Sequence, residues 1–159
     1  MKTSLQFLKC DLDHTLLSRS SYNNRIENTL IIEKVIPMST NLYEAIGGVT
    51  TVSRLVDAFY PRVYADSDLN PLFVGDIEEI KHKQRLFLTQ FLGGPQLYSE
   101  AYGLPNMKKL HMDFEITPIR AMAWLRCMNE AMDEIGLGGN ERQFFYARLS
   151  NVAQVMINA

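Results

Sequence analysis

Residues 117–135 read TPIRAMAWLRCMNEAMDEI, and this stretch decides the fold. Thr117 is a typical helix N-cap, and Pro118 follows at the first helical position, where the missing N–H of proline costs nothing. Apolar residues then cover much of the helix circumference between Met122 and Ile135. We expect this helix to be central, buried on two sides, and to end at the glycines of residues 136–139.

Apolar spacing predicts helices on both sides of this stretch. Upstream, intervals of three and four place Val52, Leu55, Val56, Phe59, Tyr60 and Val63 on one face. A second helix is expected from Asp76, a cap with Glu79 three residues later, to Gly93-Gly94-Pro95, with a stripe formed by Ile77, Ile80, Gln84, Phe87, Leu88 and Phe91. Downstream, Asn140 with Gln143 predicts the cap of the last helix, whose face is Phe144, Phe145, Leu149, Val152, Val155 and Met156.

The segment between the second and the central helix has little periodicity. Residues 96–105 read as irregular, and a short helical piece is expected around residues 107–111. Strand-like alternation and internal repeats do not occur in the sequence. The predicted fold class is therefore all-α.

Composition limits the function classes. The chain has 159 residues, 47% of them hydrophobic and 21% charged, with a net charge of −2, which is ordinary for a globular protein and gives no attraction to nucleic acid or to anionic membrane. No apolar run approaches the roughly 20 residues of a transmembrane helix. We expect a cytoplasmic protein in which Cys10 and Cys127 are reduced.

Residues 1–37 differ in character from the rest. They show no sustained helical period, whereas Met38 opens a stretch that looks like an ordinary protein start. We interpret residues 1–37 as an N-terminal extension, poorly ordered or a misassigned start, and residues 38–159 as the folded domain. Intact mass of the natively expressed protein tests this interpretation.

Three polar residues lie on helix faces that should be buried. Gln84 stands within the stripe of the second helix, where a buried amide without partners costs on the order of 1–3 kcal/mol; the alternative is that it sits at the solvent edge of that stripe. Tyr60 and Trp124 each carry one polar tip, which a buried residue normally pairs. By spacing alone, the better explanation is that both are core residues bonded to backbone carbonyls.

His111 lies in the short segment before the central helix. Most lone histidines are surface or structural residues, and neither His14 nor His82 has a metal-ligand spacing with it, so a zinc site is not expected. A single protein ligand suffices only where a macrocycle supplies the others, as in haem.

Four stretches, taken in order with His111 between the last two, carry a family resemblance. They are residues 42–48 (LYEAIGG), residues 59–63 (FYPRV), residues 87–95 (FLTQFLGGP) with Tyr98 soon after, and residues 123–128 (AWLRCM). The region from 42 to 158 resembles the truncated haemoglobins of the second group. The resemblance implies a shortened globin, with helices stacked two over two around one haem b.

The resemblance also implies roles for individual residues. His111 matches the proximal ligand of the haem iron, and Tyr60 and Trp124 match the distal hydrogen-bond donors of the second group. Gln84 and Ile80 match the distal positions on the facing helix. Gln84 is expected to join Tyr60 and Trp124 in the distal hydrogen-bonding set, and Phe73, Phe87 and Ile80 are expected to shape the apolar pocket. Members often have arginine immediately before the proximal histidine, where this chain has Leu110, so Lys108 or Lys109 is expected to meet the haem propionates.

The implied function is reversible binding of dioxygen or related diatomic ligands, for oxygen transport or scavenging, by a monomer or weak homo-oligomer. An alternative is a haem enzyme with peroxidase-like or nitric oxide dioxygenase activity, which would need a separate reductase. A globin-fold sensor without haem is less consistent with His111 and the distal set.

The N-terminal region has a further resemblance. Residues 10–17 (CDLDHTLL) resemble the first motif of the haloacid dehalogenase-like phosphatases, in which Asp11 would be the nucleophile and Asp13 the acid/base. That family also requires a parallel sheet, a later lysine and an acidic pair for magnesium. Because a helical, globin-like sequence follows, we do not expect phosphatase activity.

Overall fold

The computed structural model describes residues 41–159, and within this range every regular element is helical. The α-helices are α2 (Leu42–Ala45), α3 (Gly48–Ala65), α4 (Ile77–Phe91), α5 (Leu97–Tyr102), α6 (Met107–His111), α7 (Pro118–Glu134) and α8 (Gly139–Met156), with a 3-10 turn at Asn70–Leu72. The all-α prediction is confirmed. The predictions for residues 1–37, including those for Cys10, Asp11 and Asp13, lie outside the described residues.

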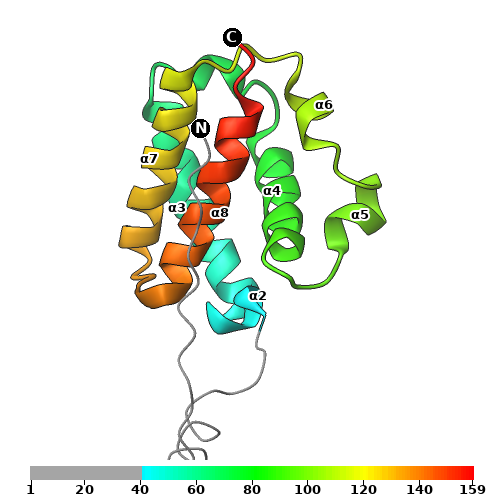
Figure 1. Cartoon of the computed structure of the whole chain (residues 1–159), viewed down its shortest axis with the longest axis vertical. Helices are drawn as coiled ribbons and strands as arrows, with labels where there is room; N and C mark the ends of the chain where they lie inside the picture. Colours follow the sequence, from blue (N-terminus) through cyan, green and yellow to red (C-terminus); the bar gives the residue numbers. More distant parts are fainter. Residues whose placement is uncertain (1–40) are drawn as a thin grey trace, which may run out of the picture. The chain divides into compact units, whose positions relative to one another are not determined.

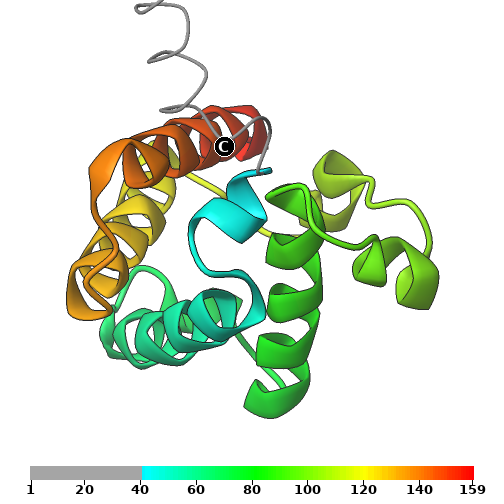
Figure 2. The same cartoon turned by 90° about the horizontal axis from the view of Figure 1, so that it is seen from below.

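Four long helices form the frame. Helix α3 packs against α4 and α7, and α7 packs against α8. Seen from below, α3, α4, α7 and α8 surround a common interior, and α5 and α6 lie on the outer side of α4 (Figures 1 and 2). This arrangement confirms the two-over-two prediction.

The core is centred on the packed apolar faces of α3 and α7, and Leu88 of α4 and Phe145 of α8 belong to it as well. All six residues predicted for the face of α3 are buried: Val52, Leu55, Val56, Phe59, Tyr60 and Val63. Helix α7 contributes Ala123, Cys127, Met128, Ala131 and Met132 to the same core. Helix α3 starts after Gly47, whose φ of 101° favours glycine and whose Cβ, if present, would lie 2.7 Å from Oγ1 of Thr51.

Two of the three predicted helix starts are confirmed. Thr117 caps α7 by accepting a hydrogen bond from the backbone N–H of Arg120, and Asp76 caps α4 by accepting one from Glu78. The prediction that Asn140 caps the last helix is wrong. Helix α8 begins two residues earlier, at Gly139 with Gly138 as its cap, because Gly139 with φ 72° lets the chain turn into the helix there.

The prediction of an irregular segment at residues 96–105 is also wrong in part, because α5 occupies Leu97–Tyr102. Six residues are too few to show a helical period. Helix α5 is docked on α4 by Gln90, whose side chain donates to Oγ of Ser99 (2.7 Å) and accepts from its backbone N–H (2.9 Å).

The predicted helix faces are too wide at their edges. Four residues assigned to apolar faces are exposed: Ile77, Met122, Phe144 and Val155. Cys127 is 3% exposed, and burial raises the pKa of its thiol, as expected of a structural cysteine. Within residues 41–159, no helix is long and apolar enough to cross a bilayer.

Candidate functional site

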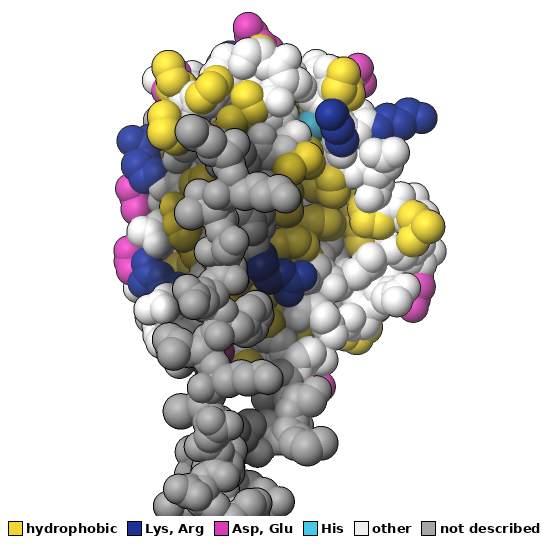
Figure 3. All heavy atoms as spheres, viewed as in Figure 1, with side chains coloured by type: hydrophobic (Ala, Val, Ile, Leu, Met, Phe, Trp, Pro, Cys, Tyr) yellow, Lys and Arg dark blue, Asp and Glu magenta, His cyan; other side chains and the backbone are white. Residues whose placement is uncertain are grey.

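A cavity of about 280 Å³ opens among α4, α6, α7 and α8. Its lining is mainly apolar and comprises Leu69, Leu72, Phe73, Val74, Ile80, Phe87, Phe91, Met107, Phe114, Ile116, Ala121, Leu149, Val152, Ala153 and Met156, with Gln84, His111, Arg120 and Trp124 as the polar members. Hydrophobic side chains gather in the hollow between α4 and α8, and a histidine lies at its upper edge near Lys or Arg side chains (Figure 3). Such a pocket, apolar with a few polar groups, is typical of a ligand site.

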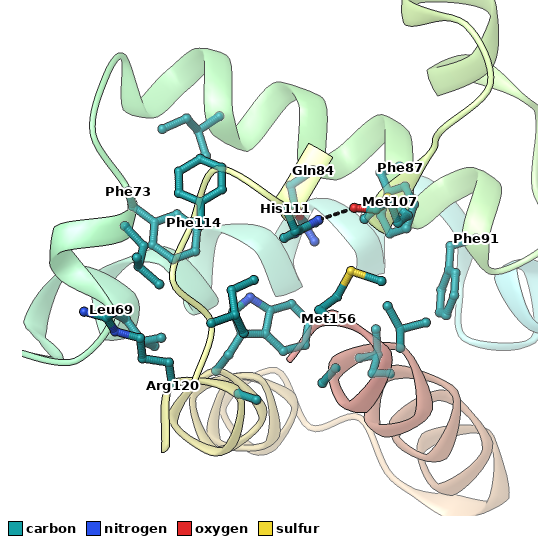
Figure 4. Close-up of a pocket in the computed structure, with 18 of the residues that line it drawn as sticks. Leu69, Phe73, Gln84, Phe87, Phe91, Met107, His111, Phe114, Arg120 and Met156 are labelled. Carbon is teal, nitrogen blue, oxygen red and sulfur yellow. Dashed lines mark hydrogen bonds between the residues drawn. The ribbon is translucent and has the colours of Figure 1, made fainter. Parts of the chain in front are cut away.

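His111 reaches this cavity from the last position of α6. Its Nδ1 lies 2.6 Å from the backbone oxygen of Met107, one turn earlier in the same helix (Figure 4). A carbonyl oxygen only accepts hydrogen bonds, so Nδ1 carries the proton and Nε2 keeps its lone pair. Metal-binding histidines are commonly oriented by a hydrogen bond of this kind.

Helix α4 supplies three of the predicted residues to the cavity wall. Ile80, Gln84 and Phe87 all line it, as their spacing of four and three residues on one helix face requires. Phe73, just after the 3-10 turn, lines the cavity on the side opposite Phe91, and His111 lies between these two (Figure 4). Gln84 therefore belongs to the cavity wall, where its side chain is half-buried.

Trp124 lines the cavity from α7, whereas Tyr60 does not line it. The indole of Trp124 packs edge-to-face on Phe59, with ring centroids 5.3 Å apart. Tyr60 is 1% exposed and packs behind the cavity wall. Its ring centroid lies 6.0 Å from that of Phe73, which does line the cavity. Burial, reinforced by the neighbouring Tyr64, raises the pKa of Tyr60 although Arg85 opposes the shift, so its hydroxyl stays protonated as a donor at neutral pH.

The lysines expected to meet haem propionates do not line the cavity. Lys108 and Lys109 are exposed, and the cationic side chain in the lining is instead Arg120. Its guanidinium donates to the backbone oxygen of Asp68 (3.2 Å) and to the backbone and carboxylate oxygens of Glu115 (2.6 and 3.1 Å). Arg120 was not among the predicted site residues, although its position four residues before Trp124 places both on one face of α7.

These residues fit a haem group. The apolar walls suit a macrocycle, and Nε2 of His111 could supply the one nitrogen that a haem iron needs from the protein. A bare metal ion has no comparable site, because no cluster of three or more His, Cys, Asp or Glu side chains occurs within residues 41–159.

Comparisons with known proteins agree with this chemistry. Residues 41–158 match the family described as bacterial-like globin. The Group 2 truncated hemoglobin YjbI of Bacillus subtilis (strain 168) is 49% identical over 116 residues, which cover 73% of this chain and 87% of the relative.

Solved structures give the same result. The group II truncated hemoglobin from Bacillus anthracis has a TM-score of 0.75 at 48% identity, covering 77% of this chain and 94% of that one. The structure described as a truncated oxygen-avid haemoglobin from Bacillus subtilis has a TM-score of 0.73 at 48% identity, covering 75% and 100%. Haem iron is the cofactor of globins, which bind dioxygen and other diatomic ligands. The chain belongs to the bacterial-like globin family, among the group II truncated haemoglobins.

Proposed function

We propose that this protein holds a haem through His111 and binds dioxygen or a related diatomic ligand beside Trp124 and Gln84, with Tyr60 behind the cavity wall. The observation that carries the proposal is the 2.6 Å contact between Nδ1 of His111 and the oxygen of Met107 on the wall of an apolar cavity. It occupies Nδ1 and leaves Nε2 as the ring nitrogen available to a haem iron.

Haem, when bound, supplies the iron position at which a diatomic ligand attaches. The protein's own side chains would set the polarity around that ligand. A bound ligand that carries partial negative charge, as dioxygen on haem would, would be stabilised by neutral N–H or O–H donors more in a dry pocket than in water. Gln84 and Trp124 offer such donors from facing helices, and the protonated hydroxyl of Tyr60 stands behind them.

The lining favours ligand binding over acid–base catalysis. Among the described residues no carboxylate lines the cavity, and Ile80 is apolar. The guanidinium of Arg120 already donates to Asp68 and Glu115. Proton transfer to a bound peroxide would need a positioned acid or base in addition to His111, so we favour a binder of diatomic ligands over a peroxidase-like enzyme.

Reconstitution with haem tests the proposal. The full-length protein should form a stoichiometric complex with a sharp Soret band that shifts with dioxygen or carbon monoxide. His111→Ala should abolish or greatly weaken this complex. His82→Ala is the matched control, because His82 is exposed on α4 and does not line the cavity. A Soret band that forms equally well in His111→Ala would refute the proposed ligand.

A further inference from the structure

Helix α6 has little stability of its own. It contains five residues, Met107–His111, and none of them is buried. An isolated helix of this length is unstable in water, because one or two backbone hydrogen bonds do not offset the entropy of nucleation. The position of His111 must therefore depend on contacts made by other parts of the chain.

Several such contacts come from Asn158, an exposed residue near the end of the sequence. Its Nδ2 donates to the backbone oxygens of His111 (3.1 Å) and Phe114 (2.9 Å). Its Oδ1 accepts from the N–H of Ile116 (2.9 Å), and its own N–H donates to the oxygen of Ile116 (3.0 Å). One residue thus makes four hydrogen bonds to the segment that joins α6 to α7, and Figure 1 shows the C-terminus beside that segment.

We propose that Asn158 is a positioning residue for His111. The inference rests on the proposed role of His111, and Asn158 does not itself line the cavity. The oxygen that Asn158 binds belongs to His111, so fixing it fixes the peptide unit that follows the histidine. The opposite end of α6 is held by Asn106, whose Oδ1 accepts from the N–H of Lys109 (3.1 Å). With both ends held, the imidazole keeps its direction toward the cavity.

The donor and acceptor atoms of Asn158 can be tested separately. Asn158→Ala removes all three side-chain hydrogen bonds. Asn158→Asp keeps an oxygen for the N–H of Ile116 but places the second carboxylate oxygen against the carbonyls of His111 and Phe114. If the Nδ2 donor positions His111, the aspartate variant should be as impaired as the alanine variant. Asn151→Ala is the matched control, since Asn151 is an exposed asparagine on α8.

The first measurement is amide hydrogen exchange on the full-length protein as purified, with the urea midpoint of the same samples. In Asn158→Ala and Asn158→Asp, exchange in residues 107–114 should accelerate by about tenfold, while exchange in α3 and the urea midpoint stay close to wild type. Unchanged exchange in residues 107–114, or equal acceleration in the Asn151→Ala control, would overturn the proposal.

The second measurement is resonance Raman spectroscopy of the haem-loaded, reduced protein. The iron–histidine stretching band should shift or broaden in both Asn158 variants and not in Asn151→Ala. Accelerated exchange with an unchanged band would show that Asn158 holds the loop without directing His111, which overturns the positioning role. If wild type shows no such band although it binds haem, the proposed role of His111 fails, whereas the exchange result still decides whether Asn158 anchors α6.

Discussion

Replacing Trp124 with phenylalanine separates polarity from shape in the cavity. Trp124 lines the cavity and packs edge-to-face on Phe59, at 5.3 Å between ring centroids. Phenylalanine keeps an aromatic ring against Phe59 and removes the indole N–H. The variant should fold, load haem and differ mainly in the donor offered to the bound ligand.

The size of the effect follows from one lost hydrogen bond to a partly charged acceptor. Such a bond contributes about 1.5–3 kcal/mol, which corresponds to roughly a ten- to hundredfold faster dissociation of dioxygen. Tyr60→Phe should have a smaller effect, below about tenfold, because Tyr60 lies one layer behind the cavity lining.

Stopped-flow replacement of dioxygen and of carbon monoxide measures both rates. Carbon monoxide gains little charge when bound, so its dissociation should change much less than that of dioxygen. An equal change for both gases would mean that Trp124 acts through its size and shape and not through a hydrogen bond from its indole N–H. Dioxygen dissociation within twofold of wild type would refute our account of ligand control.

Three further predictions concern stability. Met128→Ala, at a residue that is 0% exposed, should lower the free energy of unfolding by about 2–5 kcal/mol in urea titration, and an unchanged midpoint would contradict the packing described. Gln90→Ala removes both bonds to Ser99 and should speed limited proteolysis within α5 several-fold without changing the urea midpoint. The hydrogen bond from Arg142 lowers the pKa of Asp133. The stability that this hydrogen bond adds is therefore fully present above the ordinary aspartate pKa of about 4, and it is lost as the pH falls through the lowered pKa. Wild type and Arg142→Gln should therefore differ more in urea midpoint at pH 7 than at pH 2.

Local patterns were sufficient for much of the fold. The buried face of α3 and the cap of α7 depend on residues at most a few positions apart, which is the range over which spacing and capping rules operate. Predictions failed where a helix was too short to show a period, or where two neighbouring residues could each have started a helix. Helix α5 is shorter than two turns, and the start of α8 depends on a glycine that can adopt a positive φ one residue before the predicted cap.

The candidate site likewise contains residues that local sequence patterns could place and residues that they could not. Ile80, Gln84 and Phe87 belong to a long helix, and one correctly identified face brings all three to the cavity. The prediction for Lys108 depended on how a five-residue helix is oriented, which its own sequence does not determine. Arg120 occupies the lining because α7, a helix of 17 residues, carries it there together with Trp124.

The distance between partners explains why Asn158 could not be found from spacing. Gln84 could be identified as a candidate from the sequence because its polar side chain interrupts the apolar stripe of its own helix. Asn158 interrupts no pattern, and its partners are backbone groups 42 to 47 residues earlier in the chain. A ligand residue on a short helix takes its position from such long-range contacts. In this globin, the sequence near His111 indicates which side chain is offered to the cavity, whereas on our proposal Asn158, 47 residues later in the chain, holds that side chain in position.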